Sequence, residues 1–123
     1  MKAIFVLASS GSTFYTMDRI SRLKAFIDTY PADMFSRHAL AMELVKLGQY
    51  PDALDAMISL LAADENHSGT YYHLGKLYEQ LGDHENALKV YEKGINIADK
   101  VKAGNDLREL KGALSQLKDE LDQ

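Results

Sequence analysis

Four histidines are the side chains with the most obvious capacity for chemistry in this chain, which has no cysteine. They are His38, His67, His73 and His84. A zinc site on a helix needs ligands about one turn apart, as in His-Glu-x-x-His, and the histidines do not have that spacing. The serine-rich stretch at 9–12 lacks the lysine and the spacing of a phosphate-binding loop, and Asp52 and Asp83 stand at helix starts, where capping explains them. We therefore expect no catalytic site, no metal and no cofactor.

The composition of the chain narrows the class of partner. With 123 residues, of which 46% are apolar, it can bury a core as one domain without disulfides. Fourteen basic and eighteen acidic residues give a net charge of −4, which is the wrong sign for tracking phosphates, so we expect no nucleic acid as ligand. No apolar run approaches the roughly 20 residues of a membrane span.

The first residues, 1–8, carry one lysine followed by an apolar stretch. The stretch is shorter than the roughly 7 to 15 apolar residues of a secretory signal, so we expect a cytoplasmic protein and keep secretion as the weaker alternative. The small polar residues 9–13 are typical of a linker. We predict a flexible tail over 1–16 and a folded domain over 17–121.

Apolar residues recur at steps of three and four along the rest of the chain, which predicts amphipathic helices. The expected helices are 17–30, 34–47, 51–63, 69–81, 84–101 and 105–121. Pro31 ends the first helix, and Gly48 and Gly82 supply left-handed residues after the second and fourth. The residues expected to cap helix starts are Asp33, Ser68 and Asp83, together with Asp106 in a capping box with Glu109.

Two segments of the chain share one pattern with an offset of 34 residues. The matching pairs are Leu40/Leu74, Leu44/Tyr78, Leu47/Leu81, Gly48/Gly82, Ala53/Ala87 and Leu54/Leu88. A fixed period of this length predicts stacked helical hairpins. Gly75 lies inside a helix, where glycine costs about 1 kcal/mol relative to alanine, so we expect a close backbone approach there.

The pattern Tyr71-x-x-Leu74-Gly75-x-x-Tyr78, followed by Ala87-x-x-x-Tyr91, resembles the tetratricopeptide repeat family. This resemblance implies an all-α fold, a right-handed stack of antiparallel helical hairpins forming an α-solenoid fragment. It assigns a first repeat to 34–67 and a second repeat to 68–101, between capping helices at 17–30 and 105–121. The first repeat departs from the family pattern at Arg37, which replaces the aromatic residue, and both repeats lack the closing proline, since Glu65 and Asp99 stand there.

In that family the first helices of the repeats line a concave groove, so the resemblance implies a non-enzymatic adaptor that binds a peptide or helical segment of another protein. The corresponding groove positions are Phe35, His38, Met42, Val45, Lys46, Tyr72, His73, Lys76, Glu79 and Gln80. The histidines among them are interpreted as hydrated surface residues. One family subset grips a chaperone's terminal carboxylate with lysine and asparagine, but His38 and Met42 stand at those positions, so we expect a short or weakly held peptide.

A structural or self-assembling role remains the alternative to the adaptor. The last helix carries a narrow leucine strip that could pair between chains as a homodimer. The apolar tail Ile4 to Leu7 could do the same. The strip consists of Leu107, Leu110, Leu114, Leu117 and Leu121, and it could equally cover the end of the repeat array as a cap.

Overall fold

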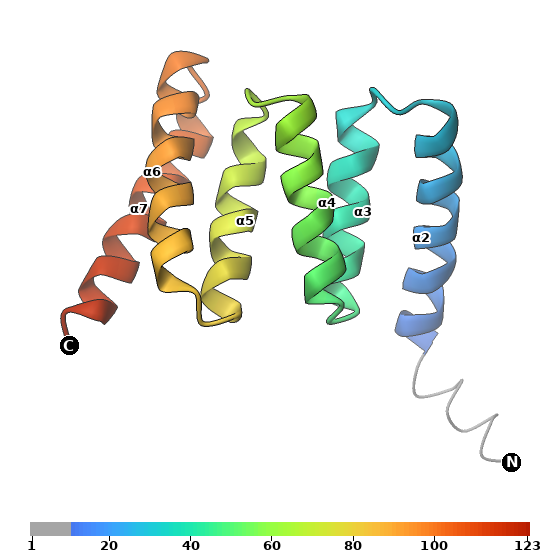
Figure 1. Cartoon of the computed structure of the whole chain (residues 1–123), viewed down its shortest axis with the longest axis horizontal. Coiled ribbons are helices and arrows are strands. Elements are labelled where there is room, and N and C mark those ends of the chain that lie inside the picture. The colour runs from blue at the N-terminus through green and yellow to red at the C-terminus, as the bar shows by residue number, and fades with distance from the viewer. Residues whose placement is uncertain (1–10) are drawn as a thin grey trace, which may run out of the picture. The chain divides into compact units, whose positions relative to one another are not determined.

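The computed structural model describes residues 11–123, in which there are six helices and no strand (Figure 1). The helices are α2 (Gly11–Thr29), α3 (Met34–Lys46), α4 (Tyr50–Ala63), α5 (Ser68–Gln80), α6 (His84–Lys100) and α7 (Gly104–Leu121). The predicted all-α class is confirmed. The described residues divide into two compact units, which meet between Ala56 and Met57. The expectations for residues 1–10, including the apolar segment Ile4 to Leu7, lie outside the described residues.

The first described helix is longer than the sequence indicated. Helix α2 begins at Gly11, six residues before the expected start at 17, and ends before Pro31 as predicted. Small polar residues are poor helix formers in an interior but are well tolerated at a helix start, where they do not interrupt the apolar stripe. The predicted linker and tail were therefore wrong for residues 11–16, which are helical.

The 34-residue period is visible in the helix bounds. Helices α3 and α5 begin and end 34 residues apart, and α4 and α6 begin 34 residues apart. Gly48 and Gly82 have φ values of 74° and 77°, and the N–H groups of both donate to the carbonyl three residues earlier, at 2.9 and 3.0 Å. This is the left-handed C-terminal turn for which glycine is favoured, and its repetition confirms the predicted register.

Two of the expected caps are present. Asp33 accepts hydrogen bonds from the Phe35 N–H at 3.2 Å and from the Ser36 hydroxyl at 3.0 Å. Asp83 accepts from the backbone N–H of Asn86 at 3.2 Å and from its side-chain amide at 2.7 Å. These bonds satisfy amides at the starts of α3 and α6 that have no partner within the helix.

The other two expected caps were wrong. Ser68 is the first residue of α5, His67 is the N-cap, and α7 begins at Gly104, so that Asp106 lies inside its first turn. The hydroxyl of Ser68 donates to the Asp106 carboxylate at 2.5 Å. Because the two side chains bond to each other, they tie the start of α5 to the start of α7 instead of each capping its own helix.

The second unit has a continuous apolar core in which α6 packs against both α5 and α7. A Cβ added to Gly75 would lie 2.1 Å from Cε1 of Tyr91, and one added to Gly94 would lie 2.5 Å from Cβ of Tyr71. The close approach predicted at Gly75 is thus confirmed. The equally close approach at Gly94 was not anticipated. The buried core residues are Tyr71, Ala87, Tyr91, Ile97, Ala98, Leu110, Ala113 and Leu117.

The leucine strip of α7 is used inside the second unit. Leu110 and Leu117 are fully buried, Leu107 and Leu114 pack against the core, and only Leu121 of the five is exposed. A strip occupied in this way covers α5 and α6 and offers little apolar area to another chain, so it does not favour the self-assembly alternative.

In the first unit, α2 packs against α3. Ile20 of α2 is buried, and Arg19 of α2 forms an ion pair with Glu43 of α3 at 3.1 Å. Glu43 is only 6% exposed and also contacts Lys46 at 3.3 Å. A buried carboxylate thus helps to set how these two helices meet.

Candidate functional site

Four of the five groove residues predicted on α5 form one cluster, Tyr72, His73, Lys76 and Glu79, which we call the α5 cluster. The rings of Tyr72 and His73 meet edge to face with their centroids 5.3 Å apart. The Lys76 ammonium lies 5.7 Å from the centroid of the Tyr72 ring, within cation–π range, and 3.7 Å from the Glu79 carboxylate. The fifth residue, Gln80, is exposed at the end of the helix.

The buried side of α5 holds this cluster in place. Tyr71, Leu74 and Leu77 are each at most 4% exposed. Tyr91 of α6, which is also buried, donates a hydrogen bond from its hydroxyl to the carboxylate of Glu79, a member of the α5 cluster. Burial, followed by this bond to Glu79, raises the pKa of Tyr91 well above its ordinary value, so the phenol remains a donor. The buried Tyr91 therefore orients the Glu79 carboxylate within the α5 cluster.

His73 is half-buried, so only part of its ring is open to water. Burial lowers its pKa because desolvation disfavours the charged imidazolium, and the nearby carboxylates of Glu109 and Asp106 partly oppose that shift. The two acidic groups come from α7, so the cap helix supplies negative charge beside the α5 cluster.

The other five predicted groove residues lie on α3 in the first unit. Phe35 is 80% exposed, whereas His38, Met42 and Val45 are half-buried. Lys46 is exposed and pairs with Glu43. The ten predicted residues thus fall into two sets, one on the first helix of each repeat, and Phe35 is the most accessible apolar side chain among them.

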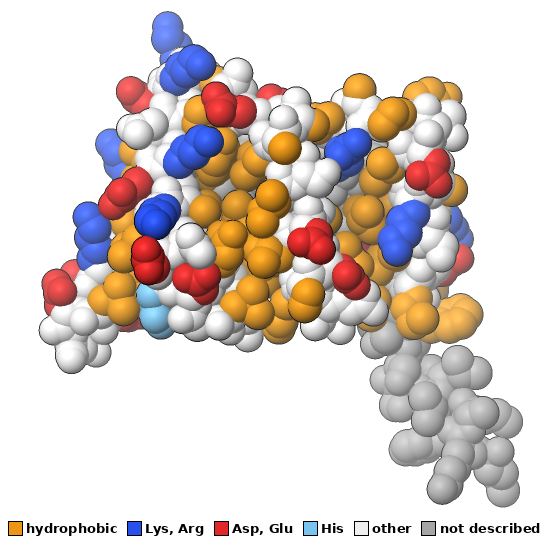
Figure 2. All heavy atoms as spheres, in the orientation of Figure 1, with side chains coloured by type: hydrophobic (Ala, Val, Ile, Leu, Met, Phe, Trp, Pro, Cys, Tyr) orange, Lys and Arg blue, Asp and Glu red, His pale blue; other side chains and the backbone are white. Residues whose placement is uncertain are grey.

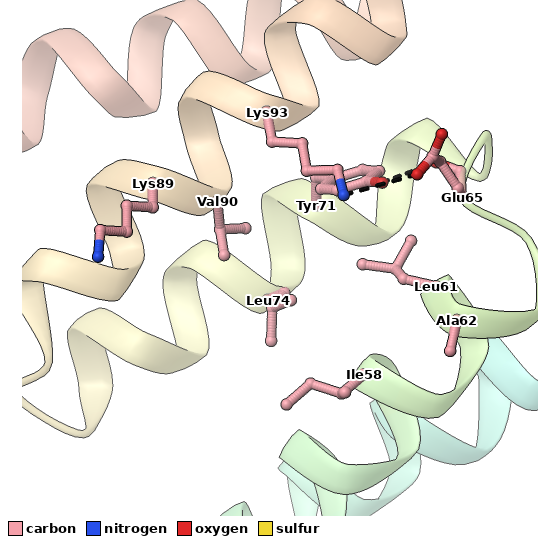
Figure 3. Close-up of a pocket in the computed structure, with 9 residues that line it drawn as sticks. All are labelled: Ile58, Leu61, Ala62, Glu65, Tyr71, Leu74, Lys89, Val90 and Lys93. Carbon is pink, nitrogen blue, oxygen red and sulfur yellow. Dashed lines mark hydrogen bonds and ion pairs between the residues drawn. The ribbon is translucent and has the colours of Figure 1, made fainter.

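The second unit also contains a trough that the sequence did not reveal. It has a volume of about 450 Å³ and runs between one turn each of α4, α5 and α6 (Figure 3). Tyr71 and Leu74 belong to the repeat pattern, but that pattern carries no information on how far apart the neighbouring helices stand. The lining residues are Ile58, Leu61, Ala62, Glu65, Tyr71, Leu74, Lys89, Val90 and Lys93.

One end of the trough is polar. The Tyr71 hydroxyl donates to the backbone carbonyl of Glu65 at 2.7 Å, and the Lys93 ammonium lies 3.6 Å from the Glu65 carboxylate (Figure 3). On the face shown in Figure 2, apolar side chains gather between α4 and α6, with cationic side chains along α6. The rest of the lining is aliphatic except for Lys89.

Comparison with known proteins identifies the fold family. The sequence model of the tetratricopeptide repeat family matches residues 38–100, just over half of the chain. The chain belongs to the tetratricopeptide repeat family. The match spans most of the first repeat and nearly all of the second. It includes Glu65 and Asp99, where the closing prolines of the family pattern are missing, and it begins just after Arg37.

Similar proteins support this assignment. A repeat-containing protein of Methanocaldococcus jannaschii is 30% identical over 84 residues, which are 68% of this chain and 26% of that protein, so the chain spans about a quarter of the relative. The crystal structure of a tetratricopeptide repeat domain protein from Salinibacter ruber shows 40% identity and a TM-score of 0.67 over 70% of this chain and 96% of that one.

A third similar structure, the TPR2B domain of yeast Sti1 in its pHsp70 complex, has a TM-score of 0.79 at 16% identity, covering 97% of this chain and 95% of that one. At that identity the likeness concerns the fold alone. Within residues 11–123 of the tetratricopeptide repeat chain, no three acidic or histidine side chains converge as a metal site would require. None of the described helices combines the length and apolar character needed to cross a bilayer.

Proposed function

We propose that this chain is a non-enzymatic interaction module that binds a peptide or helical segment of another protein through side chains on the first helix of each repeat, α3 in the first unit and α5 in the second. Membership of the tetratricopeptide repeat family supports protein–protein interaction in general terms. The choice of surface rests on the side chains of these two helices.

The α5 cluster is the observation that carries this proposal. Tyr72 and Lys76 are partly exposed, and each already has a partner on the same helix. A side chain that is ordered before binding loses less conformational entropy when a partner arrives, and tyrosine is among the residues most often responsible for binding energy. Phe35 and Met42 on α3 supply exposed and adaptable apolar contacts of the same kind.

The charge beside the cluster favours a basic partner segment. Three carboxylates, those of Glu79, Asp106 and Glu109, lie on or next to it, while Lys76 is its one ammonium among the described residues. Opposite charge on the partner would speed association, and salt would weaken it. Because one carboxylate is already bonded to Tyr91 and another to Ser68, we expect Glu109 to make the largest contribution to this preference.

The test is affinity capture from cell lysate followed by mass spectrometry. We expect the double variant Met42→Glu with Tyr72→Ala to keep its helical content by circular dichroism and to lose the proteins that the unmodified chain captures. Tyr15→Ala with Asn96→Glu is the matched control, since it removes an exposed tyrosine of α2 and adds one carboxylate at an exposed position of α6.

The proposal is wrong if the Met42/Tyr72 variant captures the same proteins in the same amounts as the control. Glu109→Gln and a rise in salt should both weaken capture if the bound segment is basic. Capture that is insensitive to both would be compatible with binding through α3 and α5 and would remove the preference for a basic segment.

A further inference from the structure

The trough between α4, α5 and α6 lies apart from the proposed binding residues and has the size of a small-molecule site. Its volume of about 450 Å³ falls within the roughly 300 to 1,000 Å³ of ligand pockets. Leu74 and Tyr71 form the floor, Ile58, Leu61 and Ala62 form one wall, and α6 forms the other (Figure 3). All of these residues belong to the second unit, so the trough is formed by one compact body.

The walls of the trough provide few free hydrogen-bonding groups for a ligand. The lining residues of α4, α5 and α6 use their backbone N–H and C=O groups within the helices. The Tyr71 hydroxyl is already committed to the Glu65 carbonyl. An extended peptide lying here would bury amides without partners, at a cost of about 1 to 3 kcal/mol for each unsatisfied group. The trough therefore suits a hydrocarbon chain.

The rim of the trough, in contrast, suits one anionic group. Lys89 and Lys93 are one turn apart on α6, so their Cβ atoms stand about 5 to 6 Å apart. Their ammonium groups point in opposite directions in the structure (Figure 3), and rotation of both flexible side chains would bring the two groups to one anion. Within the described part of the chain, each forms one exposed ion pair, Lys89 with Glu85 at 3.2 Å and Lys93 with Glu65 at 3.6 Å. Such pairs contribute little, so an incoming carboxylate can displace them.

We infer that this trough binds an unbranched monocarboxylic acid of medium chain length, a free fatty acid, with its chain over Leu74 and its carboxylate between Lys89 and Lys93. The chain replaces water on the aliphatic walls, and the carboxylate stays at the open edge, where it keeps part of its hydration. Glu65 lies on the opposite wall and competes for Lys93. This site goes beyond the proposed protein-binding function and does not depend on it.

The experiment titrates the full chain with sodium octanoate and follows the methyl resonances of Ile58, Leu61, Leu74 and Val90 by two-dimensional NMR. We expect these methyl groups to shift together and to saturate. Octyltrimethylammonium, which has the same chain and the opposite charge, should bind at least about fivefold more weakly, because its head group meets two ammoniums. Neutral 1-octanol should fall between the two.

Charge variants at the rim should act in opposite directions. Lys89→Gln with Lys93→Gln should weaken octanoate by about fivefold and leave 1-octanol unchanged within a factor of two. Glu65→Gln removes the competing carboxylate and should tighten octanoate by about twofold. Ala62→Phe, at an exposed position of the wall, should fill the trough and weaken octanoate and 1-octanol alike. Circular dichroism checks that each variant is folded.

Three results would overturn the inference. The first is that octanoate leaves the four methyl resonances unshifted, or shifts those of α2 instead. The second is that octanoate and octyltrimethylammonium bind equally, or that the lysine variants bind octanoate as the unmodified chain does. The third is that a helical peptide with one leucine between glutamates shifts these methyls where octanoate does not, which would identify the occupant as a partner's side chain.

Discussion

Arg37 and Tyr71 occupy the same position in the first and second repeats, and both donate a hydrogen bond to the carbonyl six residues earlier. The guanidinium of Arg37 reaches the carbonyl of Pro31 at 2.7 Å, and the hydroxyl of Tyr71 reaches that of Glu65 at the same distance. The departure from the family pattern at Arg37 therefore keeps the bond that ties each first helix to the turn before it. The backbone frame of a repeat can be preserved by a different side chain.

The interiors of the two repeats differ more. Leu77 in the second repeat is buried, whereas its counterpart in the first is Glu43, a carboxylate 6% exposed that pairs with Arg19 and Lys46. Gly75 in the second repeat has the Tyr91 ring directly against it, whereas the matching residue Ala41 carries a side chain that is fully buried. The shared turns and caps thus fix the 34-residue register, whereas the side chains that fill the interior differ from one repeat to the other.

The largest expected effect comes from giving the second repeat the residue of the first at position 75. In Gly75→Ala the added methyl overlaps the buried Tyr91 ring, which cannot move freely, so the free energy of unfolding should fall by about 1 to 3 kcal/mol. This loss should appear even though alanine is favoured over glycine in helices by about 1 kcal/mol. Urea unfolding followed by circular dichroism measures the change.

The double variant Gly75→Ala with Tyr91→Met tests whether the two positions act as a pair, since Met57 matches Tyr91 in the first repeat. Its loss of stability should be smaller than the sum of the two single losses by about 0.5 to 3 kcal/mol, because the methyl no longer meets a ring. Additive losses would mean that the two substitutions act independently, and that the contact between Gly75 and the Tyr91 ring explains neither loss of stability.

A smaller effect on stability is expected for the reverse exchange in the first repeat. Glu43→Leu gives the first repeat the apolar residue that Leu77 supplies in the second. Arg19 and Lys46 are exposed, so water can solvate their charges once the carboxylate is gone. Replacing a buried charge by a leucine is often neutral or stabilising, so the free energy of unfolding should stay level or rise by about 1 kcal/mol. Urea unfolding of the full chain, with Arg19→Ala as control, measures it.

Glu43→Leu would contradict this view of the first unit if it lowered the free energy of unfolding by more than about 2 kcal/mol, a loss that belongs to a buried pair whose second charge is left unsolvated. Arg19→Ala should cost less than about 1 kcal/mol, because its guanidinium lies mostly in water. Comparing the changes in the free energy of unfolding of Glu43→Leu and Arg19→Ala would then show whether the charge at position 43 or the packing there contributes more to stability.

The same contrast explains how much of the molecule could be predicted from the sequence. Features read from a local pattern were predicted: the glycine turns, the caps at Asp33 and Asp83, and the close approach at Gly75. Features that depend on which helices meet were not. Ser68 bonds to Asp106, which is 38 residues away, and no local pattern distinguishes such a bond from a cap.

The candidate sites follow the same rule. The family resemblance assigned Tyr72 and Lys76 to a groove, and both are partly exposed on α5. It could not show that they contact each other or that carboxylates of α7 lie near His73. The trough was missed because its volume depends on the spacing between three helices, and a sequence pattern records only which face of each helix is apolar. The use of the ten predicted residues in binding stays a prediction.

The smallest expected effect is a pH response confined to the second repeat, since Ala39 stands in the first where His73 stands in the second. The pKa of His73 is lowered in the folded state, so protonation favours the unfolded chain. The contribution of the neutral imidazole is complete above the unfolded pKa, near 6.5, and is lost as the pH falls from there through the lower folded value. His73→Gln should therefore show a smaller drop in Tm between pH 8 and pH 5 than the unmodified chain.

Glu109→Gln provides the opposite change. The Glu109 carboxylate partly offsets the effect of burial on His73, so its removal should lower the pKa of His73 further and make the drop in Tm on acidification larger. In the double variant with His73→Gln that extra drop should vanish, because no imidazole remains for the carboxylate to act on. If the extra drop in Tm persists in the double variant, it comes from the Glu109 substitution itself and not from His73. The difference in pH response between the two repeats would then come from α7 and not from the histidine.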